Sequence, residues 1–141
     1  MASKGQFTGM RGVYLVAAEL ARRGFIASPT SRSAIGADLL VTDAKMQRAY
    51  SVQVKTNAGT FNFWLVGKHA TELASDSYIY VLVNLREKPK GGGEDIQYFV
   101  VPSNVVKKHV LYEQSKTGTE WYSFMRTNAE PYRDKWSVFD E

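Results

Sequence analysis

The sequence predicts a single α/β domain in which a mixed β-sheet is flanked by helices. Three observations lead to this fold class: an amphipathic helix near the start, several apolar runs of strand length after it, and a second helical pattern beyond them. The 141 residues suit one domain, and 44% hydrophobic with 23% charged residues is typical of a folded globular chain. We expect one domain over residues 1–141, with a core at about 9–114 and a tail at 115–141.

Composition narrows the class of protein further. The chain has no Cys, so it forms no disulfide and no thiolate metal site. No apolar run approaches the roughly 20 residues of a membrane helix, and residues 1–12 lack the apolar region of a secretory signal, so we expect a cytoplasmic protein. The net charge of +4 and the pI of about 9.3 are compatible with a polyanionic partner such as DNA, without requiring one.

The first helix is predicted at residues 9–23. Val13, Val16 and Leu20 recur at helical spacing and form one apolar stripe. Two arginines in the last turn complement the helix dipole, and Gly24 directly after them is a natural stop. This helix therefore offers one apolar face to the predicted sheet.

The strands are predicted from apolar runs that end at polar, glycine or proline residues. The run at 77–85 is continuously apolar, which is typical of a strand buried on both faces. Residues 61–66 fit either a strand or an apolar arm, and residues 68–74 fit a short helix. A second long helix is predicted at 103–114, with Ser103 as its N-cap. The expected strands are 25–29, 37–41, 49–56, 77–85 and 96–102, and the expected loops are 30–36 and 87–95.

Three polar side chains are expected to meet on two of these strands. If the second and third strands pair as an antiparallel hairpin around the polar turn between them, Asp38 faces Gln53 directly. Lys55 lies two positions farther along, so its side chain points to the same face as that of Gln53. Val52 and Val54 then point to the opposite face, into the core.

This group suits the hydrolysis of a phosphodiester. A hard cation such as Mg²⁺ prefers oxygen ligands, which the Asp38 carboxylate, the Gln53 side-chain oxygen and the Val54 backbone carbonyl would provide. Lys55 would orient or help to deprotonate the attacking water and stabilise charge on the phosphate. A plainer interpretation also stands: Gln and Lys at alternate positions are usual on a solvated strand face, and Asp38 then simply begins a strand.

The chain resembles the PD-(D/E)XK nuclease superfamily, and most closely its Holliday-junction-resolvase-like branch. The resemblance covers roughly residues 9–110. It rests on Glu19 in the helix "VYLVAAELARRGF", on Asp38 in "IGADLLV", and on Gln53 with Lys55 in "SVQVKT".

The resemblance implies a restriction-endonuclease-like fold with the core order α-β-β-β-α-β and a nuclease that cuts DNA with Mg²⁺ or Mn²⁺. It assigns Asp38, Gln53, Lys55 and Glu19 to catalysis, with Asp38, Gln53, Glu19 and the Val54 carbonyl on the metal. It is also compatible with a homodimer, since resolvases bind two-fold symmetric junctions. Gln53 departs from the usual acid, and the lost negative charge lowers the expected metal affinity. The alternative is a weak or inactive nuclease-fold module that binds nucleic acid or a protein partner.

Basic and small polar residues supply candidate contacts to DNA phosphates. Ser31, Arg32 and Ser33 lie shortly before Asp38 in a polar segment that is otherwise an ordinary surface loop. Phosphate contacts need only positive charge and reach, so scattered cations are candidates as well as ordinary surface residues. The candidates of this kind are Lys4, Arg11, Arg22, Arg23, Lys45, Arg48 and Lys68.

Aromatic and histidine side chains complete the candidates. Phe61, Phe63 and Trp64 form a cluster that suits either stacking on exposed bases or packing in a core or interface. His69 and His109 are isolated and form no pair with metal-ligand spacing. The glycine-rich segment "KGGGED" lacks the following Lys-Ser/Thr of a P-loop and is interpreted as a turn.

Overall fold

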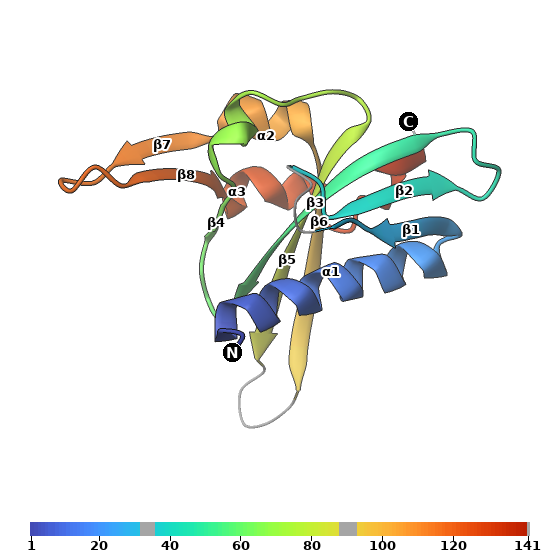
Figure 1. The fold of residues 1–141 in the computed structure, drawn as a ribbon, viewed down its shortest axis with the longest axis horizontal. Helices are drawn as coiled ribbons and strands as arrows, with labels where there is room; N and C mark the ends of the chain where they lie inside the picture. The colour runs from blue at the N-terminus through green and yellow to red at the C-terminus, as the bar shows by residue number, and fades with distance from the viewer. Residues whose placement is uncertain (32–35, 88–92, 141) are drawn as a thin grey trace.

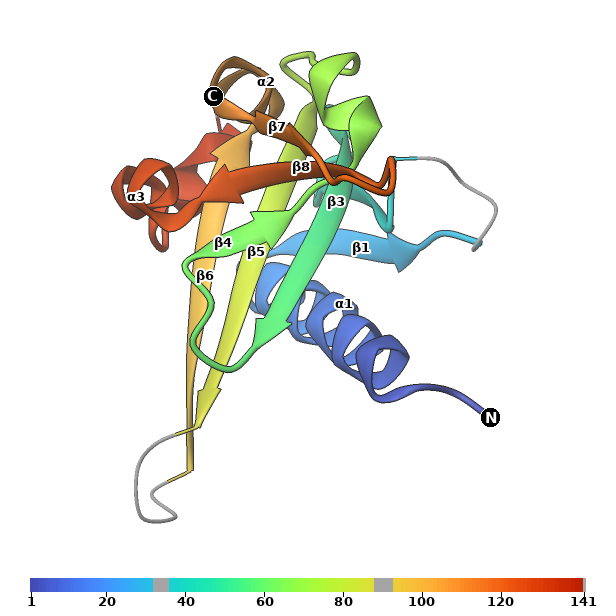
Figure 2. The same cartoon turned by 90° about the vertical axis from the view of Figure 1, so that its left-hand side faces the viewer.

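The computed structural model describes residues 1–31, 36–87 and 93–140 (Figure 1). Within them, a five-stranded mixed sheet forms the centre, a helix crosses one of its faces, and a smaller sheet with short helices covers the other (Figure 2). No helix in this part of the chain is both long and apolar enough to cross a membrane. The predicted α/β class with a mixed sheet is therefore confirmed.

Helix α1 (Lys4–Arg22) begins five residues earlier than the apolar stripe predicted. Ser3 is its N-cap: the Ser3 hydroxyl accepts a hydrogen bond from the Gln6 backbone N–H at 3.2 Å, and the Gln6 side-chain oxygen accepts one from the Ser3 N–H at 2.8 Å. This reciprocal capping box satisfies two of the backbone donors that a helix start leaves unpaired. The added turns carry α1 past the core and over one edge of the sheet.

The main sheet has the strand order β1-β2-β3-β5-β6. Only β3 and β5 run parallel, and the other neighbours are antiparallel. The crossover between the two parallel strands contains a short strand and one turn of 3₁₀ helix, where the implied core order places an α-helix. The strands are β1 (Phe25–Pro29), β2 (Leu39–Asp43), β3 (Ala49–Ala58), β5 (Tyr78–Glu87) and β6 (Glu94–Pro102).

Two hydrophobic clusters lie on the two faces of β5. Ile79, Val81 and Val83 are buried on the α1 face, whereas Tyr80 and Leu82 are buried on the other face. The prediction that this strand is buried on both sides is confirmed. The second cluster is closed by a sheet of order β4-β8-β7 together with short helices. These elements are β4 (Phe63–Leu65), η1 (Lys68–Thr71), α2 (Ser103–His109), β7 (Leu111–Gln114), β8 (Glu120–Met125) and α3 (Arg126–Ala129).

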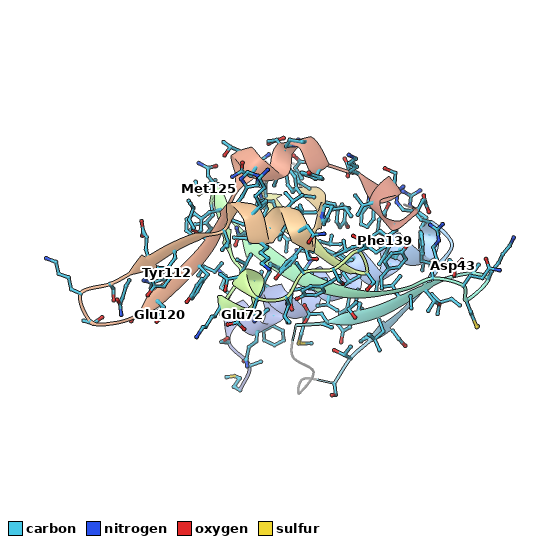
Figure 3. The ribbon with its side chains drawn as sticks, turned by 90° about the horizontal axis from the view of Figure 1, so that it is seen from above. Asp43, Glu72, Tyr112, Glu120, Met125 and Phe139 are labelled. Carbon is cyan, nitrogen blue, oxygen red and sulfur yellow. The ribbon has the colours of Figure 1, made fainter. Side chains whose placement is uncertain are left out.

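The second half of the chain differs from the prediction. The helix expected over 103–114 ends at His109, because residues 111–114 pair with β8 as strand β7. Ser103 does not cap α2; its hydroxyl donates to the Ser75 carbonyl at 2.9 Å and accepts from the Ser75 N–H at 3.0 Å. The β7–β8 hairpin projects from the body, with Tyr112 and Glu120 on it (Figures 1 and 3).

The tail belongs to the domain. Two one-turn helices, η3 (Glu130–Tyr132) and η4 (Trp136–Asp140), follow α3. Trp136 and Phe139 are buried in the cluster beneath α1, and the guanidinium of Arg23 lies 4.9 Å from the Trp136 ring centroid. The tail therefore closes the end of the core nearest the C-terminus of α1. Of the expected loops, residues 32–35 and 88–92 lie outside the described residues.

Candidate active site

The site lies where β3 extends beyond β2. The last pair between these strands is Leu39 with Val52, whereas β3 stays paired with β5 as far as Ala58 with Leu85. Residues 53–58 therefore have a strand neighbour on one side only. The open edge that results is the floor of the pocket.

Asp38 sits at the entrance to β2, opposite this edge. Its backbone N–H donates to the Val52 carbonyl at 2.8 Å, which continues the predicted register. Its Oδ2 atom accepts two further hydrogen bonds, from Gln53 Nε2 and from the Val54 N–H, each at 2.8 Å. The prediction that Asp38 faces Gln53 is confirmed, and Val54 is buried on the core side as expected.

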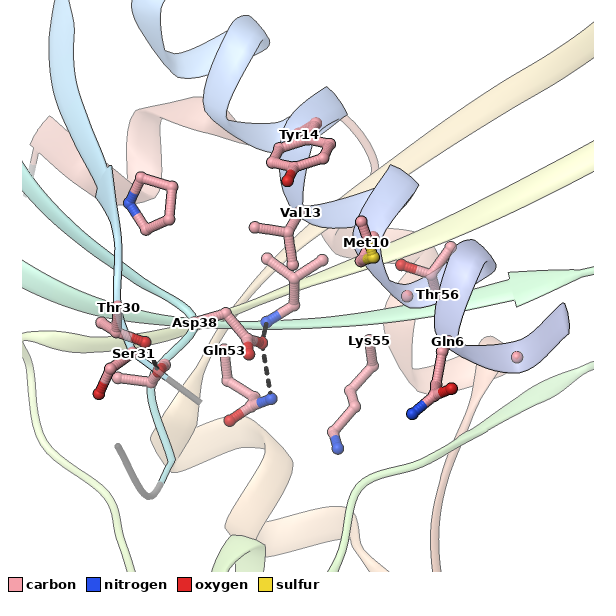
Figure 4. Close-up of a pocket in the computed structure, with 15 residues that line it drawn as sticks. Gln6, Met10, Val13, Tyr14, Thr30, Ser31, Asp38, Gln53, Lys55 and Thr56 are labelled. Atoms are coloured by element: carbon pink, nitrogen blue, oxygen red, sulfur yellow. Dashed lines mark hydrogen bonds between the residues drawn. The ribbon is translucent and has the colours of Figure 1, made fainter. Parts of the chain in front are cut away.

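The Lys55 side chain lines the same pocket as Asp38 and Gln53 (Figure 4). The pocket has a volume of about 480 Å³ and is lined by the first half of α1, the end of β1 and residues 53–56 of β3. Gln53 is buried, with 7% of its surface exposed, whereas Lys55 is half-buried. The predicted convergence of Asp38, Gln53 and Lys55 therefore holds, and it occurs in an open, partly polar cavity.

The oxygen atoms at this edge fit a hard cation with few protein ligands. The two N–H donors occupy Oδ2 of Asp38 and leave Oδ1 for another partner. The N–H and C=O of one residue in a strand point to the same side, so the Val54 carbonyl is directed toward this edge as well. Gln53 presents its amide nitrogen to Asp38, and rotation of the amide by half a turn would present its oxygen. Mg²⁺ commonly keeps several waters beside one or two carboxylates, which suits so small a ligand set.

The expected contribution of Glu19 to this site is corrected by the structure. Glu19 does not line the pocket; its carboxylate pairs with Arg22 at 2.5 Å and with Arg23 at 3.0 Å. The hydrogen bond from Arg22 is the main cause that lowers the pKa of Glu19, although partial burial opposes it. Glu19 lies about 9 Å along the helix axis from Val13, an α1 residue that lines the pocket. In the described residues no group of three or more His, Cys, Asp or Glu could hold a metal.

The predicted phosphate contacts separate into three cases. Ser31 lines the pocket, whereas Arg32 and Ser33 lie outside the described residues. Arg11 lines a groove of about 810 Å³ on the other flank of α1, and this groove also contains Lys4 and Arg86. Lys68 begins η1 and is exposed, but it does not line the pocket.

Several residues of the pocket were missed by the sequence prediction. Gln6, Met10 and Tyr14 project from the first half of α1 into the pocket (Figure 4). The Ser3-to-Gln6 capping signature would have extended the predicted helix to include Gln6, whereas Met10 and Tyr14 already lay within it. Close approach of α1 is made possible by Gly12, where a Cβ atom would lie 1.7 Å from the Thr56 hydroxyl. Thus glycine at this helix position brings α1 down onto the open edge.

Two titratable side chains lie near the site without lining the pocket. Burial lowers the pKa of His69, and the nearby positive charge of Lys55 lowers it further. Burial raises the pKa of Tyr78, and the Asp38 carboxylate contributes in the same direction. Both pKa shifts favour the uncharged side chain, for His69 near Lys55 and for Tyr78 near Asp38.

The fold is similar to that of solved nucleases. A bacterial homing endonuclease, I-Ssp6803I, aligns with a TM-score of 0.59 at 15% identity, covering 98% of this chain and 91% of that chain. Hjc, a Holliday junction resolvase from the archaeal hyperthermophile Archaeoglobus fulgidus, aligns with a TM-score of 0.46 at 11% identity, covering 87% of this chain and 88% of that chain. The sequence matches no protein-family model and no curated protein. The likeness to the homing endonuclease confirms the predicted restriction-endonuclease-like fold.

Proposed function

We propose that this protein is a metal-dependent nuclease that hydrolyses DNA phosphodiester bonds in the pocket at the open edge of β3. The observation that carries the proposal is the convergence of Asp38, Gln53 and Lys55 in one accessible cavity. The shared fold with a homing endonuclease supports DNA as the partner. The net charge of +4 supports it too, because binding to the phosphate backbone is chiefly electrostatic.

Each group at the edge has a distinct role in this proposal. The free Oδ1 of Asp38, the Val54 carbonyl and a rotated Gln53 amide would hold Mg²⁺ or Mn²⁺, which supplies positive charge beside the phosphate when bound. Lys55 holds the attacking water in line with the phosphorus and stabilises the negative charge that develops on the phosphate oxygens. The Val54 N–H keeps Asp38 in place through its hydrogen bond to Oδ2.

Cleavage assays with matched charge variants test the proposal. Branched, single-stranded and duplex DNA are incubated with the purified protein in Mn²⁺, and products are quantified on gels. Asp38→Ala and Lys55→Ala should each lower the cleavage rate by at least about 100-fold, the usual loss when a group acts directly in proton transfer or charge stabilisation. Glu113→Ala and Lys116→Ala remove the same charges from the β7–β8 hairpin and should cut at the wild-type rate. No cleavage of any of the three DNAs by the wild-type protein would refute hydrolysis.

A second candidate function is DNA binding without hydrolysis. The observation that favours it is the hydrogen bond from Gln53 Nε2 to Asp38 Oδ2, which places an amide N–H where a cation would otherwise neutralise the carboxylate. A nuclease fold with this pair left intact would hold DNA and leave it uncut. In that case DNA binding is salt-sensitive and is unchanged in Asp38→Asn.

The variant Gln53→Glu separates the two functions. A second carboxylate beside Asp38 adds attraction for a cation on the order of 4 kcal/mol per unit of cation charge, at about 4 Å and an effective dielectric near 20. In a nuclease, Gln53→Glu should tighten Mn²⁺ binding measured by isothermal titration calorimetry and increase cutting. Gln53→Leu, of similar size and without charge, is the matched control. Tighter Mn²⁺ binding without any cutting would favour the binding module.

A further inference from the structure

A second cavity adjoins the candidate active site along the same edge of β3. It has a volume of about 290 Å³ and lies between β3 and the segment that leads into β4. Lys55 and Thr56 line both cavities, so the two are neighbours on one strand. The lining residues are Lys55, Thr56, Asn57, Phe61, Phe63, Trp64 and Leu65.

The walls of this cavity are aromatic, and one ring is accessible. Phe61 is 53% exposed, and its ring meets that of Phe63 edge-to-face with 5.9 Å between centroids. Trp64 is buried behind them and donates its indole N–H to the Val83 carbonyl at 3.1 Å. The Asn57 amide donates to the Phe63 carbonyl at 2.5 Å, which ties this segment to β3. The segment that carries the exposed Phe61 ring is therefore anchored to the main sheet.

Charge and size identify what this cavity would take. Lys55 is charged at its border, and no acidic side chain is among its lining residues. The volume is at the lower end for small-ligand pockets, and aromatic faces favour a flat ring. A planar group attached to an anion meets both requirements. A nucleotide has this form, with its base in the aromatic cavity and its phosphate beside Lys55.

We infer that the cavity lined by Phe61 binds one unstacked base, next to the phosphate held at Asp38 and Lys55. The inference rests on the proposed function and deepens it, because it names the substrate class as DNA that carries an unpaired nucleotide at this position. A fully paired duplex keeps its bases stacked and has none to offer. Aromatic side chains stack on any base, so we expect preference for the unpaired state without strong sequence preference.

Binding measured without cleavage tests this inference. Fluorescence anisotropy in EDTA compares a single-stranded oligonucleotide, a duplex with one unpaired 2-aminopurine, and the fully paired duplex. Phe61→Ala should weaken binding to the first two by roughly 5- to 150-fold, the range for loss of one base–aromatic stack, and leave the paired duplex unchanged. Phe61→Tyr keeps the ring and should bind as the wild type does. Trp121→Ala removes another exposed aromatic, on β8, and should have no effect.

The fluorescence of 2-aminopurine gives a second readout, because neighbouring bases in the DNA stack quench it and it rises when the base leaves the stack. A rise in fluorescence on binding to the wild type that is lost in Phe61→Ala supports the inference. Equal loss of affinity for paired and unpaired DNA in Phe61→Ala, or unaltered affinity for both, overturns it while DNA binding by the protein still stands. Failure of the wild-type protein to bind any of the three DNAs at low salt, both in EDTA and with Ca²⁺ added, overturns both this inference and the proposed function.

Discussion

The two halves of β3 are neighbours in sequence but differ in their surroundings. The first half pairs with β2 through residues 49–52 and carries the buried Val52 into the core. The second half, residues 53–58, pairs with β5 alone and carries Gln53 and Lys55 at an open edge. One strand thus anchors the sheet with its first half and presents polar groups with its second. The boundary is set by the point at which β2 begins.

The difference between the two halves of β3 predicts that the pairing of its first half with β2 determines the stability of the fold. Leu39 pairs with Val52 and is fully buried, so Leu39→Ala removes packed atoms and leaves a cavity. We expect a loss of about 2–5 kcal/mol in the free energy of unfolding, measured by urea denaturation. Leu40→Ala is the matched control. Leu40 follows Leu39 in β2 but is 53% exposed, so this variant should lose less than about 0.5 kcal/mol in the free energy of unfolding. Equal losses in the two variants would contradict the comparison.

The second half of β3 depends on α1 for its cover, and Gly12 tests this dependence. A Cβ atom at Gly12 would lie 1.7 Å from the Thr56 hydroxyl and 2.8 Å from the Thr56 Cβ, so α1 must move away from the open edge. Gly12→Ala should cost about 1–3 kcal/mol of stability, the usual cost of overpacking, despite the higher helix propensity of alanine.

Gly9 provides the matched control for this substitution. It lies in the same helix with nothing within 4 Å of its Cβ position, so Gly9→Ala should stabilise the fold by up to about 1 kcal/mol. Gly12→Ala combined with Thr56→Gly should recover part of the loss, because it removes the clashing atoms. Loss of stability in both single alanine variants would show that the contact with Thr56 is not the cause.

The parts of the site that sequence could predict are those determined by local pairing. The Asp38–Gln53 register followed from the alternation of Val52 and Val54 and from one polar turn, since a hairpin register depends on neighbouring residues. The division of residues 103–114 into α2 and β7 could not be predicted in this way. Those four strand residues pair with β8, and local propensity carries no information about a partner that follows a turn.

The orientations of individual side chains also could not be predicted from the sequence. Nothing in the pattern around Gln53 specifies whether its nitrogen or its oxygen meets Asp38, because both ends of the amide have the same shape. Glu19 shows the same limit. Its helical position was correctly predicted, but two arginines at the next turn attract its carboxylate. These ion pairs, which the strand pattern does not reveal, determine where the Glu19 side chain points.

Removal of the ion pairs of Glu19 has the smallest expected effect. It distinguishes a contribution of Glu19 to stability from a contribution to catalysis. Interaction with Arg22 and Arg23 lowers the pKa of Glu19 below its ordinary value of 4.5. The pairs therefore stabilise the fold above that pH, and the contribution disappears as the pH falls through the lowered pKa. Glu19→Gln should cost about 0.3–0.5 kcal/mol at pH 7, and the cost should shrink as the pH falls through the lowered pKa of Glu19, measured by urea denaturation over that pH range. DNA cleavage at pH 7 should be unchanged, because Glu19 does not line the pocket. A large loss of cleavage with unchanged stability would instead return Glu19 to the catalytic group.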